Sequence, residues 1–141
     1  AKQCRGIDDM QQGDIGDWRV RAIRGATTVP ENSIAAMTAA VTELLDALED
    51  NNPITPEAMI SVTFSVTSDL DAIFPAAIAR QRPHWDTVPL LDVQHMDVAE
   101  SLPMCIRFLI HVYMTIPQAE IYHPYLQGAS GLRPDWASVT A

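Results

Sequence analysis

Apolar and polar residues alternate along three stretches of the chain, which is the pattern of a β-strand with one buried face. The most regular stretch is 60–67, ISVTFSVT, in which every second side chain is apolar. In residues 18–24, WRVRAIR, Trp18, Val20 and Ala22 share one face with Arg24. Residues 105–114, CIRFLIHVYM, are the most apolar and place Arg107 among apolar neighbours. The pattern predicts three strands, two of which carry an arginine among apolar side chains.

A different period, three and four residues, runs through 34–48 and predicts one long amphipathic helix. Asn32 or Ser33 can cap its start, and residues 51–53, NNP, end it. Prolines predict short helices from Pro56 and over 75–82, with a helical turn at 117–120. Ser68 and Asp71 resemble a capping arrangement for a short helical segment that Pro75 interrupts or restarts near Phe74. Residues 87–93 predict a strand at a sheet edge or bulge, because they contain a proline, and residues 122–126 predict a last extended stretch.

These elements fit a single α+β domain in a chain of 141 residues. We expect about five strands in a mixed sheet, because the connections after residue 87 are short and one strand has a polar face. One long helix cannot cover both sheet faces, so the other face predicts association with further subunits. Residues 1–17 lack an apolar period and are expected to form a flexible extension outside the domain of residues 18–141.

Charge and cysteine content exclude several classes of function. Eighteen acidic against nine basic residues give a net charge of −9, which disfavours binding to a nucleic-acid backbone. The chain has no apolar run near the roughly 20 residues that cross a membrane. Two cysteines are too few for a disulfide framework and favour a reducing compartment, the cytoplasm. The histidine spacings do not suggest a metal site, and we expect no cofactor.

The basic residues point to anion binding. Eight of the nine are arginines, and none lies between Arg24 and Arg80. Arginine is favoured where planar anions are bound, and a guanidinium on an apolar strand needs an anionic partner. For Arg24 and Arg107 that partner is either a carboxylate of the chain or a bound ligand. Tyr125 and Arg133, near the end of the chain, add further hydrogen-bond donors. The residues by themselves therefore indicate an anion-binding domain and leave the anion open.

Five blocks of the sequence, in order, resemble those of the AroH-class chorismate mutases. They are RAIRGATTV, DLDAIFPAAIAR, the segment 88–98, CIRFLI and HPYLQGASGLRPD, and the similarity spans residues 18–135. The resemblance implies an isomerase that rearranges chorismate to prephenate in aromatic amino-acid biosynthesis, without metal, cofactor or covalent intermediate. It also implies a cytoplasmic homotrimer with a barrel-like core and active sites in clefts between subunits.

Residue roles follow from the same resemblance. Arg24 would bind a substrate carboxylate, and Arg107 would contact the ether oxygen and a carboxylate. Tyr125 would hydrogen-bond a carboxylate, and Arg133 would assist at the cleft mouth. The other implied substrate-binding residues, some of them from the adjacent subunit, are Phe74, Ala76, Arg80, Leu91 and Leu132.

The chain departs from the family pattern at three places. His95 stands where the family commonly has a glutamate that meets the substrate hydroxyl, and Asp92 stands where it often has a cysteine. Our hypothesis is that Asp92 accepts the hydroxyl's hydrogen bond with His95 nearby; the alternative is that Asp92 only pairs with an arginine. Ala77 replaces a basic residue of some relatives, so the rim of the cleft would be less cationic.

Two other functions stay open at this point. One is an imine or enamine deaminase on a similar trimeric architecture, which also binds a carboxylate through an arginine. The other is a carboxylate-binding or regulatory module whose catalysis His95 has weakened. Prephenate formation, ammonia release and binding without turnover distinguish the three.

Overall fold

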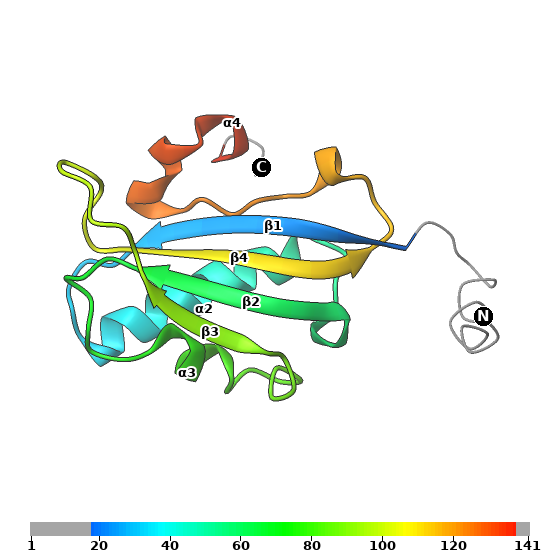
Figure 1. The fold of residues 1–141 in the computed structure, drawn as a ribbon, viewed down its shortest axis with the longest axis horizontal. Helices are drawn as coiled ribbons and strands as arrows, with labels where there is room; N and C mark the ends of the chain where they lie inside the picture. Colours follow the sequence, from blue (N-terminus) through cyan, green and yellow to red (C-terminus); the bar gives the residue numbers. More distant parts are fainter. Residues whose placement is uncertain (1–17, 138–141) are drawn as a thin grey trace.

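The computed structural model describes residues 18–137, so the extension predicted at 1–17 lies outside the described residues. They form one four-stranded mixed sheet in the order β1-β4-β2-β3 (Figure 1). Strand β4 runs antiparallel to β1 and β2, and β3 runs parallel to β2. The strands are β1 (Arg19–Thr28), β2 (Met59–Val66), β3 (Leu90–Gln94) and β4 (Cys105–Met114). The helices are α2 (Ile34–Asp50), α3 (Pro75–Ala79) and α4 (Pro134–Ala137), with the 3-10 helices η2 (Pro56–Ala58), η3 (Gln118–Glu120) and η4 (Gln127–Leu132).

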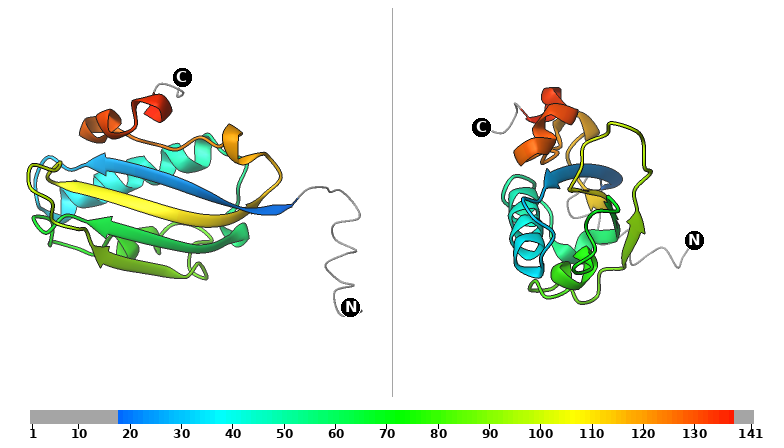
Figure 2. Two further views of the ribbon diagram at one scale, coloured as in Figure 1. Left: turned by 45° about the horizontal axis from the view of Figure 1, so that its top comes forward. Right: turned by 90° about the vertical axis from the view of Figure 1, so that its left-hand side faces the viewer.

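Helices α2 and α3 lie against one face of the sheet (Figure 2). Strand β4 alternates as its sequence predicts and turns every second side chain, from Ile106 to Met114, into the core. On α2 the buried residues are Met37, Ala40, Val41, Leu44, Leu45 and Leu48. The long helix and the strongest strand are thus confirmed, and between them they make the core.

Of the two residues predicted to cap α2, Asn32 and Ser33, the structure has Ser33 as the N-cap. The Ser33 hydroxyl accepts a hydrogen bond from the Ala36 amide at 3.1 Å. The Asn32 side chain instead bonds the side chain and the backbone amide of Asp71. Asp71 therefore holds a turn beside α2, and the short helical segment predicted from the Ser68 and Asp71 capping arrangement is wrong, since helix α3 begins only at Pro75.

Three predicted core positions are wrong. Ile34, the first residue of α2, is 59% exposed. Ile60 is exposed because the register between β2 and β4 shifts between Met59 and Ser61, and Met59 takes the buried place. On β1 the predicted apolar face that includes Val20 points away from the helices, and Ile23 of the opposite face enters the core.

The predicted fifth strand is also wrong. Residues 122–126 run along the outer edge of β1 but form only an isolated bridge between Ala26 and Tyr125. Pro124 has no N–H to donate, and the neighbouring amide of Arg24 is bound by the His123 side chain, so a regular ladder cannot form. Strand β3 starts after Pro89 and lies at the sheet edge, as its proline predicts.

No helix within residues 18–137 is long and apolar enough to cross a membrane.

Candidate active site

Arg24 and Arg107, the two arginines on apolar strands, lie close together on the sheet face opposite the helices. Arg24 pairs with Leu109 across β1 and β4, and Arg107 pairs with Ala26 in the same ladder. Arg24 and Arg107 are therefore diagonal neighbours on one face, about 7–8 Å apart at the backbone. On its other side Arg107 pairs with Ser65 of β2, so the polar face of that strand borders the arginines.

A cavity of about 700 Å³ lies over this pair. The β2 and β4 side chains form its floor, and the segment that follows β3 forms one wall. Its lining residues are Arg24, Thr63, Ser65, Gln94, His95, Met96, Val98, Ser101, Arg107, Phe108 and Leu109. Both arginines thus line one cavity, together with His95.

Among the described residues, neither arginine has the internal salt bridge that the sequence allowed. Within residues 18–137 no carboxylate lies within 4.0 Å of the guanidinium of Arg24 or Arg107. In the same described part, Arg107 Nε and the Tyr125 hydroxyl are buried without a hydrogen-bond partner. Buried donors without partners are rare in folded proteins, and Arg107 is one of the residues that line the cavity. The arrangement can accept an anion with oxygen acceptors.

The Tyr125 phenol lies within the electrostatic influence of three arginines. Burial raises the pKa of its phenol, whereas the positive charges of Arg24, Arg107 and Arg133 lower it. Arg133 itself bonds Asp135 through Nε at 3.1 Å and Nη2 at 2.9 Å, and its guanidinium lies 3.4 Å from the centre of the Trp136 ring. Three guanidiniums therefore act on one phenol, and one of them already has a carboxylate partner.

His95 lines the arginine cavity. Its Nδ1 is 2.8 Å from Ser65 Oγ, and its backbone amide donates to Val66. Burial lowers the pKa of His95, and the charge of Arg107 lowers it further. The ring is therefore neutral at pH 7 and offers a hydrogen-bonding nitrogen beside Arg107 without adding a negative charge.

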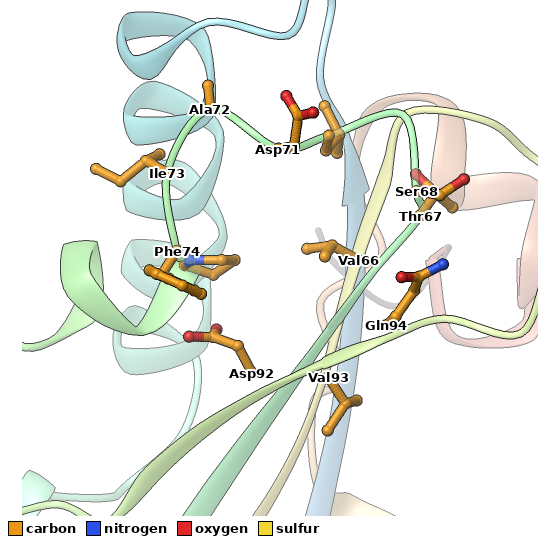
Figure 3. Close-up of a pocket in the computed structure, with 12 residues that line it drawn as sticks. Val66, Thr67, Ser68, Asp71, Ala72, Ile73, Phe74, Asp92, Val93 and Gln94 are labelled. Carbon is orange, nitrogen blue, oxygen red and sulfur yellow. The ribbon is translucent and has the colours of Figure 1, made fainter.

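Asp92 and Phe74 line a second cavity, of about 580 Å³ (Figure 3). Asp92 Oδ1 accepts a hydrogen bond from the Ala76 amide at 3.0 Å, at the start of α3. Burial raises the pKa of Asp92, while this hydrogen bond and the charge of Arg80 lower it. Asp92 lines this second cavity and not the cavity of Arg107 in the same chain. Its contact with a substrate hydroxyl therefore stays a prediction.

The other predicted site residues are spread around these two cavities. Phe74 is 71% exposed and Ala76 is buried at the start of α3, which Arg80 ends in solvent. Leu91 is exposed on the open sheet face, opposite Thr63. Leu132 is half-buried and packs against the small cluster that contains Tyr125.

Two neighbours of the arginines were not predicted. Ser65 was assigned only to a polar strand face, and its bond to His95 depends on the return of the chain after β3. The sequence analysis gives His123 no role, although its Nδ1 accepts the Arg24 backbone N–H at 3.0 Å. The polar face of its strand was the only feature of the sequence that pointed to Ser65. Nothing in the sequence indicated the hydrogen bond between His123 and the backbone of Arg24.

Comparison with known proteins gives a consistent result. The family model described as chorismate mutase type I matches residues 20–136. The chain is 38% identical over 116 residues to chorismate mutase AroH of Bacillus subtilis (strain 168), covering 82% of this chain and 91% of that protein. It is 43% identical over 120 residues to chorismate mutase AroH of Thermus thermophilus, covering 84% of this chain and 98% of that protein.

A solved structure agrees with both sequence relatives. The chorismate mutase from Clostridium thermocellum superposes with a TM-score of 0.75 at 40% sequence identity. The match covers 78% of this chain and 97% of that one.

Proposed function

Because the chain belongs to the chorismate mutase type I family and is an isomerase of chorismate, we propose that Arg107 and Arg24 are its principal catalytic residues. The reaction is the rearrangement of chorismate to prephenate in aromatic amino-acid biosynthesis. In a pericyclic rearrangement of this kind the carbon–oxygen bond breaks ahead of carbon–carbon bond formation. The ether oxygen then carries partial negative charge, which a fixed guanidinium stabilises more in the transition state than in the substrate.

One observation carries this assignment. Arg107 Nε, like the Tyr125 hydroxyl, is a buried donor without a partner among the described residues, and Arg107 and Arg24 line one cavity. A donor that is already desolvated and held in place needs little reorganisation when charge develops on a ligand oxygen. We assign Arg107 to the ether oxygen and a carboxylate, and Arg24 and Tyr125 to carboxylate binding. Arg133 assists at the cleft mouth by exchanging or sharing its Asp135 partner.

Substrate binding would supply a further part of the rate. Chorismate is a flexible dicarboxylate that reacts only from a compact conformer. The two cations of the cavity would hold the carboxylates and favour that conformer through orientation. No side chain has to transfer a proton or form a covalent bond in this scheme.

The site would be completed by a second subunit in a homotrimer with a barrel-like core. The sheet face that the described helices leave uncovered carries large apolar side chains that are 39–59% exposed. They are Val20, Leu91, Val93, Leu109 and Tyr113. An apolar face of this kind favours burial against another copy. Phe74 and Arg80, which do not line the arginine cavity of their own chain, would then contact the substrate of a neighbouring subunit in a cytoplasmic enzyme.

The primary test is an assay of the full chain with chorismate. Loss of chorismate absorbance with stoichiometric prephenate supports the proposal. Ammonia released from an imine or enamine substrate in a parallel assay would indicate a deaminase, since chorismate contains no nitrogen, and affinity for chorismate without turnover would indicate a binding module. The last outcome has a specific basis, since His95 brings no negative charge to the position where the family commonly has glutamate.

Mixed trimers test the shared site. Arg107→Ala and Arg80→Ala chains are each expected to be weak, because every site would lack one arginine. If the sites lie between subunits, refolding the two variants together creates some sites with both arginines and restores part of the activity. Activity equal to the average of the separate variants would refute sharing. For Asp92, an Asp92→Asn variant with full turnover would remove its proposed contact with the substrate hydroxyl.

A further inference from the structure

The outer edge of β1 is held by the segment that follows β4 (Figure 1). The Gln118 side chain accepts from the Ala22 amide at 3.1 Å and donates to the Ala22 carbonyl at 2.6 Å. Further along, Ala26 donates to Pro124 O and accepts from the Leu126 amide, both at 2.9 Å. These contacts use groups that do not titrate near neutral pH, so this part of the edge is insensitive to pH.

Between these contacts the backbone N–H of Arg24 donates to His123 Nδ1 at 3.0 Å. The same imidazole stacks on the Trp136 ring, with centroids 3.8 Å apart and planes inclined by 21°. The Arg133 guanidinium lies against that indole as well, 3.4 Å from the ring centre. His123, which is 6% exposed, is therefore the contact shared by the strand of Arg24 and the loop of Arg133.

We propose that His123 is a positioning residue for substrate binding, holding Arg24 directly and Arg133 through Trp136 only while its imidazole is neutral. The inference rests on the proposed roles of the two arginines as carboxylate-binding residues. A neutral imidazole with its proton on Nε2 leaves Nδ1 free to accept the Arg24 N–H. A protonated imidazole donates from both nitrogens, so it cannot accept that bond.

The charges around His123 oppose its protonation. His123, Arg24 and Trp136 line a third cavity, of about 780 Å³, whose acidic residues are Asp135 and Glu120. Arg24 on β1 and Arg133 before α4 supply the positive charges near the imidazole. Burial lowers the pKa of His123, and the two guanidiniums lower it further against an opposing contribution from Asp135. The ring is therefore neutral at pH 7, and the contact should open only in acid.

Two substitutions separate this role from simple packing. Asn places an amide oxygen near the position of Nδ1 and can accept the Arg24 N–H without titrating, whereas Leu keeps bulk and accepts nothing. We expect His123→Leu to raise KM for chorismate roughly tenfold at pH 7, the cost of one lost hydrogen bond, with a smaller effect on kcat. His123→Asn should restore most of that loss. His84→Asn is the matched control, because His84 is exposed and lines neither the cavity of His123 nor that of Arg107. This variant should behave as the wild type.

The pH dependence gives the second readout. In the wild type KM should rise as the pH falls below the ordinary histidine value of 6.5, and in His123→Asn the part of this rise caused by His123 should be absent. Tryptophan emission gives a third readout, independent of turnover, because a protonated imidazole quenches a stacked indole. The wild type should lose part of its emission in acid, and His123→Asn should not.

The outcomes are distinct. Equal KM values for the Asn and Leu variants, or an unchanged acid rise of KM in His123→Asn, would overturn the positioning role. If His123→Leu does not fold, the acid profile and emission of His123→Asn still decide the question. If the wild type does not convert chorismate, the proposed function fails, and the emission titration still tests whether His123 contacts Trp136 in a pH-dependent way.

Discussion

The Arg107→Ala variant tests whether Arg107 stabilises the transition state of the reaction without stabilising the fold. In the wild type the guanidinium lies on a strand whose neighbours are apolar, without a carboxylate within 4.0 Å among residues 18–137. Its Nε is buried and has no hydrogen-bond partner in that part of the chain. Arg107→Ala therefore removes a desolvated cation that contributes little to the folded state. We expect the free energy of unfolding to stay the same or rise.

The same substitution should be costly for catalysis. Loss of one neutral oxyanion donor costs about 3 kcal/mol in transition-state stabilisation. Arg107 supplies a full charge in addition to its donors, so the loss should exceed that value, or more than about 100-fold in kcat. KM should rise too, because a carboxylate contact is lost. Arg107→Lys should recover little, since a single ammonium cannot serve the ether oxygen and a carboxylate together.

The assay follows chorismate absorbance under saturating substrate, with urea unfolding of each variant measured in the same buffer. Arg21→Ala is a suitable control, because Arg21 lies on β1 but donates to the Ile116 carbonyl outside the arginine cavity. It should leave kcat almost unchanged. A loss of less than tenfold for Arg107→Ala, or a loss of activity that merely follows a loss of folded protein, would refute the reasoning.

Three further predictions concern stability and pH. Ser33→Ala should lower the free energy of unfolding by about 1 kcal/mol, seen in urea unfolding, with kcat unchanged, because it removes the N-cap bond to the Ala36 amide; an unchanged midpoint would show that another group caps α2. Gly25→Ala should destabilise the fold by about 1–3 kcal/mol in the same assay, since the new Cβ would lie 2.5 Å from the Phe108 ring and β1 would have to shift; wild-type stability would contradict this close packing. His95 has a pKa lowered by burial and by Arg107, so the unfolded chain binds its proton more readily. Its contribution to stability should be complete above pH 6.5 and lost as the pH falls through the folded-state pKa, and His95→Gln should remove that part of the pH dependence of unfolding; an unaltered profile would refute the assignment.

The elements best predicted from the sequence are those that pack within the chain. Strand β4 and helix α2 bury their apolar positions against each other, so the periods of two and of three to four residues translate directly into a core. Strand β1 was misjudged for a physical reason. The face that includes Val20 is apolar, yet it lies on the uncovered side of the sheet in the described chain. A pattern of apolar residues does not distinguish burial within a chain from burial against another chain.

The candidate site was predictable only where a residue conflicts with its surroundings. A cation in the middle of an apolar strand marked Arg107, and the alternation of β1 placed Arg24 on a face that proves to be the same one. Ser65 and His123 are ordinary polar residues in sequence, and their contacts depend on cross-strand register and on a distant loop. The missing fifth strand has the same origin, because side chains replace backbone groups along the edge of β1.

A crystal structure of the full chain with a stable dicarboxylate analogue of the transition state would test the central claim most directly. The distance to measure joins the bridging oxygen of the analogue to the Arg107 guanidinium. We predict a hydrogen-bonding distance of about 2.7–3.1 Å, in a cleft that Phe74 of a second subunit closes. An analogue bound elsewhere, with Arg107 paired to a carboxylate of the protein, would contradict the account.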